Sequence, residues 1–146
     1  NEARERRFTM LGRVHGDESL PSRVYMYSFP RDRLAARVEW SGAFPFRHRR
    51  HLAKIGSSGP DYVARVREQF PPNSSYKMHA GLPEWPQIEL VVCLENGQGF
   101  ETFIRRQIGA RQYPGGAGHE WYTTSHREGL ALWRRWSLRH ASRAKP

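Results

Sequence analysis

The most informative segment of the chain is Leu52-Ala53-Lys54-Ile55-Gly56-Ser57-Ser58-Gly59-Pro60-Asp61-Tyr62-Val63-Ala64-Arg65-Val66-Arg67-Glu68-Gln69-Phe70. Residues 52–56 form a short apolar run that ends in glycine, as expected of a strand followed by a turn. Residues 57–61 supply turn residues and candidate helix caps. From residue 62 to residue 70, apolar side chains recur at helical spacing. The segment therefore predicts a strand, a glycine turn and a helix in that order.

Further strands and helices are predicted on both sides of this segment. Residues 24–29 are β-branched or aromatic and lie between two prolines, which is typical of a strand. Residues 88–94 are a nearly continuous apolar run and give the clearest strand pattern in the chain. A helix is predicted over 100–112, and another begins with the capping-box pattern of residues 125–128. Two shorter pieces remain: 34–40 fits a strand or a helical turn, and 119–122 an extended segment.

This order of elements predicts an α+β fold: a small domain with a central mixed or antiparallel sheet flanked by helices, and an added C-terminal helix. A length of 146 residues suits one domain. We expect a basic N-terminal arm over 1–20, the main domain over 21–124, and a basic amphipathic helix over 125–146 that packs on the domain.

The charge balance indicates a polyanionic partner. The chain has 24 Lys and Arg against 14 Asp and Glu, a net charge of +10. Clustered cations bind nucleic acid through its phosphates whatever the base sequence. No apolar run is long enough to cross a membrane, and the single cysteine, Cys93, cannot form an internal disulfide, as in proteins of reducing compartments. We therefore expect a cytoplasmic protein with nucleic acid as its partner and no membrane; no protein partner is identifiable.

Several common catalytic motifs are absent from the sequence. It has no GxxxxGK[ST] phosphate loop, no CxxC pair, no HExxH zinc motif and no GxSxG elbow. His48 and His51 have the spacing of zinc ligands on a helix, but without thiols or a close carboxylate a solvated basic loop is the simpler interpretation. Cys93 lies within an apolar strand and is more simply a buried small side chain than a nucleophile.

The functional signal lies in an ordered set of residues: Val24-Tyr25, Lys54-Ile55-Gly56, Arg65, Glu101 and Glu120-Trp121-Tyr122. In this order they resemble the GIY-YIG nuclease superfamily, in which two short tripeptides on adjacent strands precede an Arg on the next helix and a Glu on a later one. The resemblance is closer to the branch with a Lys-Ile-Gly second motif and a downstream EWF-like tripeptide. It covers residues 23–122.

The resemblance implies a metal-dependent endonuclease that hydrolyses phosphodiester bonds, with DNA favoured over RNA. Tyr25 and Lys54 would position or activate the attacking water, and Arg65 would hold the scissile phosphate. Glu101 would carry Mg²⁺ or Mn²⁺. A single carboxylate suits Mg²⁺, because that ion keeps most of its waters and also binds phosphate oxygens.

Other basic residues are expected to contact backbone phosphates on either side of the site. They belong to the first motif, to the insertion between the two motifs and to the helices, and the C-terminal Arg-rich helix would add to them. The nucleic-acid-binding residues expected on this basis are Arg23, Arg47, His48, Arg49, Arg50, His51, Arg67 and Arg105.

The sequence also departs from the superfamily pattern. Arg23 stands where the first motif has Gly, Arg105 where the branch has His, and no Asn matches the one that many members place late in the domain. These departures favour the alternative of a non-catalytic nucleic-acid-binding protein, such as a ribosome-associated factor with a degenerate nuclease fold. A third alternative is an effector module that docks to an acidic partner.

Each candidate residue also has a purely structural interpretation. Tyr25 fits a strand aromatic packed under a helix, and Arg65 a solvated helix residue. Glu101 fits an acidic group near a helix N-terminus, where the dipole favours it. Trp121 fits a core anchor better than a base-stacking platform.

Overall fold

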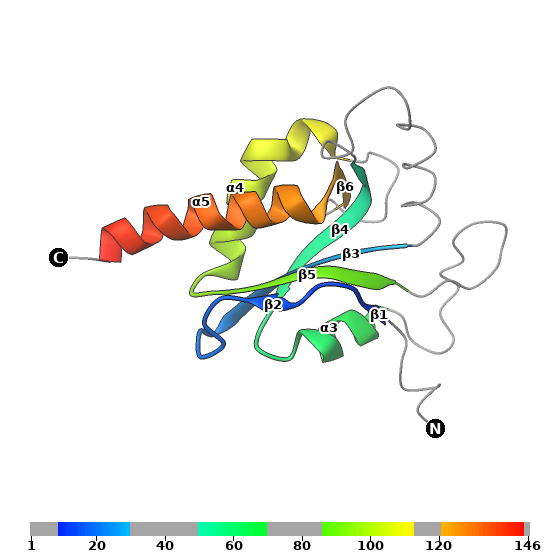
Figure 1. Ribbon diagram of the computed structural model, residues 1–146, viewed down its shortest axis with the longest axis horizontal. Helices are drawn as coiled ribbons and strands as arrows, with labels where there is room; N and C mark the ends of the chain where they lie inside the picture. The colour runs from blue at the N-terminus through cyan, green and yellow to red at the C-terminus, as the bar shows by residue number, and fades with distance from the viewer. Residues whose placement is uncertain (1–8, 30–49, 70–85, 113–120, 145–146) are drawn as a thin grey trace, which may run out of the picture.

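The computed structural model describes residues 9–29, 50–69, 86–112 and 121–144 (Figure 1). The expected cluster Arg47–Arg49, residue Glu120 and the piece over 34–40 lie outside these residues. In chain order the elements are β1 (Thr9–Met10), β2 (Val14–His15), β3 (Ser22–Ser28), β4 (His51–Ser58), α3 (Tyr62–Glu68), β5 (Gln87–Leu94), α4 (Gly97–Ile108), the 3₁₀ turn η2 (Gly109–Arg111), β6 (Trp121–Thr124) and α5 (His126–Ala144).

The strands form one mixed sheet in the order β1-β5-β3-β4-β6, and β2 also pairs with β5. β3 is the central strand and runs antiparallel to both β4 and β5. β1 and β2 run parallel to β5, at the opposite edge from β6. The predicted α+β fold with a mixed sheet and a C-terminal helix is therefore confirmed.

Both faces of the sheet are covered. Successive residues of a strand point to opposite faces. Val24 and Met26 of β3 belong to a large apolar cluster with side chains of α4 and α5, whereas Tyr25 and Tyr27 belong to an aromatic cluster with Val66 of α3. α4 and α5 thus lie on one side of the sheet and α3 on the other (Figure 1). This burial on both sides explains why the β5 sequence is almost continuously apolar.

The N-terminal segment differs from the expected arm. Residues 9–10 and 14–15 pair with β5 and extend the sheet, so at least this part of 1–20 belongs to the domain. The chain passes close to β5 at Gly12, where a Cβ atom would lie 2.1 Å from the Glu89 carbonyl oxygen. Strands of two residues are too short to produce a hydrophobic alternation, so periodicity gave no sign of them.

The helix boundaries also shift. α4 begins at Gly97 rather than at residue 100, because the Asn96 side chain caps it by accepting a 2.9 Å hydrogen bond from the Gly99 amide. The predicted helix also ends earlier than expected. Residues 109–111 form the 3₁₀ turn η2 instead of continuing α4. In the part of the chain that the structure describes, no helix is long and apolar enough to span a membrane.

α5 packs closely on the sheet at Gly129. A Cβ atom at this position would lie 2.8 Å from Met26 Cε and 2.9 Å from Leu90 Cδ2. On an exposed helix, replacing glycine with leucine stabilises by about 1 kcal/mol. Here we expect Gly129→Leu to lower the free energy of unfolding by about 1–3 kcal/mol, because overpacking outweighs the gain in helix propensity.

Urea unfolding followed by circular dichroism measures this change, with Ala131→Leu as the matched control. Ala131 is exposed on the same helix, so its substitution should shift stability by no more than about 0.5 kcal/mol. Equal stability of the two variants would contradict the close packing of α5 at Gly129.

Candidate active site

A pocket of about 360 Å³ lies where β3, β4, α3 and α4 meet. All four residues expected to be catalytic line it, although each belongs to a different element. The lining residues are Tyr25, Lys54, Gly56, Ser57, Arg65, Glu68, Gln69 and Glu101. Residues that are far apart in the sequence thus surround one cavity of the size expected for a small ligand or a phosphodiester group.

The strand register brings Tyr25 and Lys54 together. Tyr25 pairs with Gly56 across β3 and β4, and Tyr27 pairs with Lys54. Because residues two apart on a strand share a face, Tyr25, Tyr27 and Lys54 all lie on the side covered by α3. α3 follows β4 after a short turn and is capped by Asp61, whose side chain accepts from the Ala64 amide at 3.0 Å. Arg65 and Gln69 are thereby placed over the same part of the sheet.

Glu101 reaches the pocket from the other layer. α4 starts beside the ends of β3 and β4, where a Cβ atom on Gly97 would lie 3.2 Å from Ser22 Cβ and 3.3 Å from Ser57 Cβ. This approach places Glu101, in the second turn of α4, next to β4. The Ser57 hydroxyl donates a 2.8 Å hydrogen bond to Glu101 Oε2. The carboxylate therefore lies at the end of the sheet, where it can reach around to the pocket.

Gln69 links the other polar groups of the pocket. Its Nε2 donates to the Tyr25 hydroxyl at 2.8 Å, and its Oε1 accepts from Tyr27 Oη at 2.5 Å and from Lys54 Nζ at 2.8 Å. The two donors fix the orientation of the amide, because only its oxygen can accept from them. One neutral side chain thus holds the phenol and the ammonium group in a defined arrangement.

Sequence reasoning missed Gln69 and Tyr27, although patterns in the sequence point to both. Tyr27 is two residues after Tyr25, so it shares the face of the strand. Gln69 is four residues after Arg65, so it shares the face of the helix. A search for polar partners at these spacings would have found them.

Tyr25 combines a packed ring, as expected of a strand aromatic, with a hydroxyl that borders the pocket, as expected of a candidate catalytic group. Its ring is buried in the aromatic cluster, with the residue 2% exposed, and stacks on Tyr27 with ring centres 6.1 Å apart. Its hydroxyl accepts from Gln69 and borders the pocket. The packing of the ring fixes where the oxygen lies, which is what a positioned catalytic group requires.

Arg65 and Glu68 form an exposed ion pair at the mouth of the pocket. Arg65 Nη1 lies 3.3 Å from Glu68 Oε2. This hydrogen bond, and next the negative charge that Tyr25 can carry, raise the pKa of Arg65 above its usual value, so the guanidinium stays charged. Exposed pairs contribute little to stability, so Arg65 can exchange Glu68 for another anion. Glu68 also gives the pocket a second carboxylate that the sequence analysis did not identify.

Two carboxylates line the pocket and are the candidate ligands for a divalent cation. Within the described ranges, no group of three or more His, Cys, Asp or Glu side chains could hold a metal ion. Glu101 and Glu68 are the carboxylates among the described lining residues. An ion held by one or two carboxylates would complete its shell with water and substrate oxygens, as Mg²⁺ does.

Two of the side chains expected to contact nucleic acid lie largely inside the fold. Arg23 is buried, and its guanidinium donates to the carbonyl oxygens of Glu18 and Leu20, both at 2.7 Å, so it holds the N-terminal segment in place. His51 Nε2 lies 2.6 Å from Oε2 of the buried Glu89, and its side chain is 10% exposed. Both side chains bind oxygen atoms within the fold, and the sequence pattern does not reveal these partners.

The other expected contacts within the described residues stay on the surface. Arg67 and Arg105 are exposed and do not line the candidate active site. Arg50 pairs with Glu128 at 3.2 Å and lines a different pocket. Trp121 is a core anchor as expected: it is buried and stacks on Phe29 with ring centres 6.2 Å apart.

The position opposite Tyr25 requires glycine. A Cβ atom on Gly56 would lie 2.5 Å from Tyr25 Oη and 2.7 Å from Cζ, and the ring cannot move away because it packs against Tyr27. We therefore expect Gly56→Ala to lower the free energy of unfolding by about 1–3 kcal/mol and to displace the Tyr25 hydroxyl.

Chemical denaturation measures the loss in free energy of unfolding caused by Gly56→Ala. A double-mutant cycle with Tyr25→Leu tests whether this loss comes from the contact with the Tyr25 ring. The cost should shrink in the Tyr25→Leu background. Gly59→Ala is the control, because a Cβ atom there would have no neighbour within 4 Å. If Gly56→Ala costs no more than Gly59→Ala, the packing of the ring across Gly56 is wrong.

Cys93 is expected to be inert. It is 2% exposed, and burial raises the pKa of its thiol, which keeps it in the protonated, unreactive form near neutral pH. Labelling with a thiol reagent should be at least about 10²-fold slower in the native protein than in urea, because it needs local opening. Equal rates in the two conditions would show that the thiol is accessible.

Comparison with known proteins gives no match: no protein-family model, no curated protein and no solved structure matches this chain.

Proposed function

We propose that the chain is a metal-dependent endonuclease of the GIY-YIG type that hydrolyses phosphodiester bonds, with DNA favoured as substrate. The observation that supports this is the single pocket lined by Tyr25, Lys54, Arg65 and Glu101. These four were selected by their order in the sequence alone. A phenol, an ammonium, a guanidinium and a carboxylate together provide the groups that phosphodiester hydrolysis needs.

Arg65 is the group that would bind the scissile phosphate. Its planar guanidinium can donate two parallel hydrogen bonds to phosphate oxygens. In the absence of substrate, its partner is the exposed carboxylate of Glu68. Exchange of this weak surface pair for a phosphate would cost little and would leave Glu68 beside the pocket.

Tyr25 and Lys54 would position the attacking water. Gln69 holds both, and the Tyr25 oxygen accepts from its amide while also lying near the charge of Arg65. This oxygen is the group best placed to orient the water or to accept its proton. The positive charge of Lys54 would favour the developing negative charge at the phosphate.

Glu101, assisted by Glu68, would hold Mg²⁺ or Mn²⁺. When bound, such an ion offsets charge at the phosphate and the leaving oxygen. The Ser57 hydroxyl donates to Glu101 Oε2, which orients the carboxylate. We further propose a nucleic acid as partner on the basis of the net charge of +10, and a cytoplasmic location on the basis of the single cysteine.

The test is nicking of a supercoiled plasmid with Mg²⁺ or Mn²⁺, with EDTA as the blank. We expect Glu101→Gln to lower the rate by about 10²–10³-fold, the scale typical for loss of one group that stabilises charge in the transition state. The matched control is Glu95→Gln: Glu95 is exposed just before α4 and does not line the pocket, so its variant should cleave like the wild type.

Two results would contradict the proposal. Cleavage by Glu101→Gln at the wild-type rate would remove Glu101 from the site. Salt-sensitive DNA or RNA binding by the wild type without product under either metal would support the binding-only alternative. That alternative has one structural observation in its favour: Arg105, which replaces the branch histidine, is exposed and does not line the pocket.

A further inference from the structure

A second pocket, of about 390 Å³, lies between the C-terminal end of α4 and the first half of α5. It shares no lining residue with the candidate active site. We call it the arginine pocket, because its polar lining is dominated by guanidinium groups. The residues that matter here are Arg50, Arg111, Arg127, Glu128, Ala131 and Arg135.

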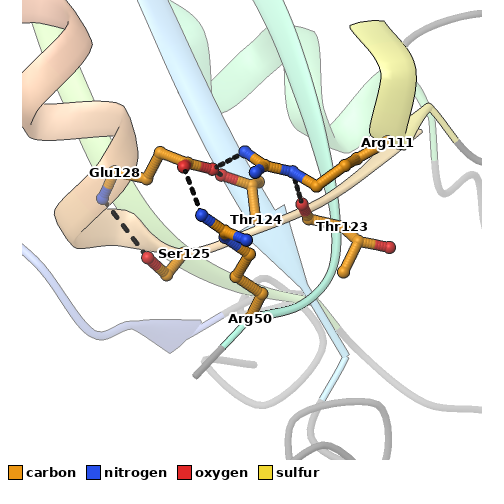
Figure 2. A network of polar contacts seen from close by, with 6 residues as sticks. All are labelled: Arg50, Arg111, Thr123, Thr124, Ser125 and Glu128. Atoms are coloured by element: carbon orange, nitrogen blue, oxygen red, sulfur yellow. Dashed lines mark hydrogen bonds and ion pairs between the residues drawn. The ribbon is translucent and has the colours of Figure 1, made fainter. Parts of the chain in front are cut away.

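Glu128 fixes two of the arginines (Figure 2). Its Oε2 accepts from Arg50 Nη2 at 3.2 Å, and its Oε1 accepts from Arg111 Nη2 and, at 2.7 Å, from the Thr124 hydroxyl. Arg111 Nε also donates to the Thr123 carbonyl oxygen at 3.1 Å. These contacts join Arg50, just before β4, to η2, β6 and α5. The two guanidiniums are thus held in place by a carboxylate whose two oxygens are both in use.

Arg127 and Arg135 face the same pocket from α5 but are not needed for this network. They lie four residues before and after Ala131, so all three share one face of the helix. Arg135 is held by the Gln107 side-chain oxygen at 3.4 Å and lies 5.9 Å from the centre of the Phe103 ring. Ala131 between them is small, which leaves the space open.

The charges in the arginine pocket do not balance. Its described lining residues include four arginines, Arg50, Arg111, Arg127 and Arg135, and a single carboxylate, Glu128, so the excess is 4 − 1 = +3. Like charges gathered at one site repel each other. Arg50 and Arg111 alone satisfy Glu128, so the exposed Arg127 and Arg135 leave the pocket with a positive excess that a bound anion would offset.

We propose that the arginine pocket binds a phosphate group of a nucleic-acid strand, at a position separate from the candidate active site. Guanidinium groups bind phosphate through paired hydrogen bonds, and two of the four are already held in a fixed orientation by Glu128. The inference rests on the proposed function for the identity of the ligand as a nucleic acid. The site itself rests on the geometry and charge of the pocket.

The test measures binding without cleavage. Fluorescence anisotropy with labelled single-stranded and duplex oligonucleotides is recorded in EDTA, with the full chain, over a series of salt concentrations. Three variants are compared with the wild type. Arg127→Ala/Arg135→Ala removes two pocket charges, Ala131→Leu fills the pocket without changing charge, and Arg13→Ala/Arg106→Ala removes two exposed charges outside the pocket.

We expect Arg127→Ala/Arg135→Ala to raise Kd about tenfold at about 0.1 M salt. It should also reduce the slope of log Kd against log salt by about 1.4 for a single strand or about 1.8 for a duplex, the values for two lost phosphate contacts. Ala131→Leu should raise Kd at least about threefold, because it occupies the space between the cations. Arg13→Ala/Arg106→Ala should change Kd by less than about threefold, since its charges lie outside the pocket.

The proposal is overturned if the pocket variants bind both oligonucleotides like the wild type, or if the Arg13→Ala/Arg106→Ala control weakens binding as much as the Arg127→Ala/Arg135→Ala variant. In a further arm, inorganic phosphate is tested for its effect on Tm. If the pocket variants lose the stabilisation by inorganic phosphate but bind oligonucleotides like the wild type, the pocket binds free phosphate and not a nucleic-acid strand, and the proposal is wrong. Because no metal is present, failure of the nuclease proposal appears separately, as intact binding without product in the plasmid assay.

Discussion

The packing of the Tyr25 ring across Gly56 is the contact on which the candidate site depends. It leaves no room for a side chain between β3 and β4 at this point, and it sets the ring within the aromatic cluster that α3 covers. Gln69 lies at the C-terminal end of α3, so the position of α3 determines whether Gln69 can donate to the Tyr25 hydroxyl. Core packing on one face of the sheet and the polar geometry of the pocket are therefore consequences of the same contact.

The two pockets are built on the same plan but differ in charge. In each, one side chain holds several polar groups: the Gln69 amide accepts from Lys54 and Tyr27 and donates to Tyr25, and the Glu128 carboxylate accepts from two arginines. The candidate active site has two cations, Lys54 and Arg65, against two carboxylates, Glu68 and Glu101. It is near neutral, which would suit the metal ion and the phosphate that we propose bind there together, whereas the +3 excess of the arginine pocket would suit an anion alone.

The sequence could predict the strands and helices in which apolar side chains recur in a regular pattern. The alternation of β3, the apolar run of β5 and the helical spacing of α4 are local patterns, and the fold class follows from them. It could not predict β1 and β2, which are two residues long. Nor could it predict the role of Arg23, whose guanidinium turns back to carbonyl oxygens one to five residues before it, or of His51, whose partner Glu89 lies on β5. The four candidate catalytic residues came from the order of motifs, whereas Gln69 needed the geometry that joins α3 to β3 and β4.

Arg23 does not obstruct the pocket, although it stands where the resemblance stated above would place a glycine. Arg23 lies two residues before Tyr25, so its side chain starts on the same face of β3 and could have filled the site. Instead, its guanidinium turns back to the carbonyl oxygens of Glu18, Leu20 and Ser22, and Arg23 is not among the lining residues. In this chain Arg23 holds the N-terminal segment in place, so the arginine is compatible with an open pocket beside Tyr25.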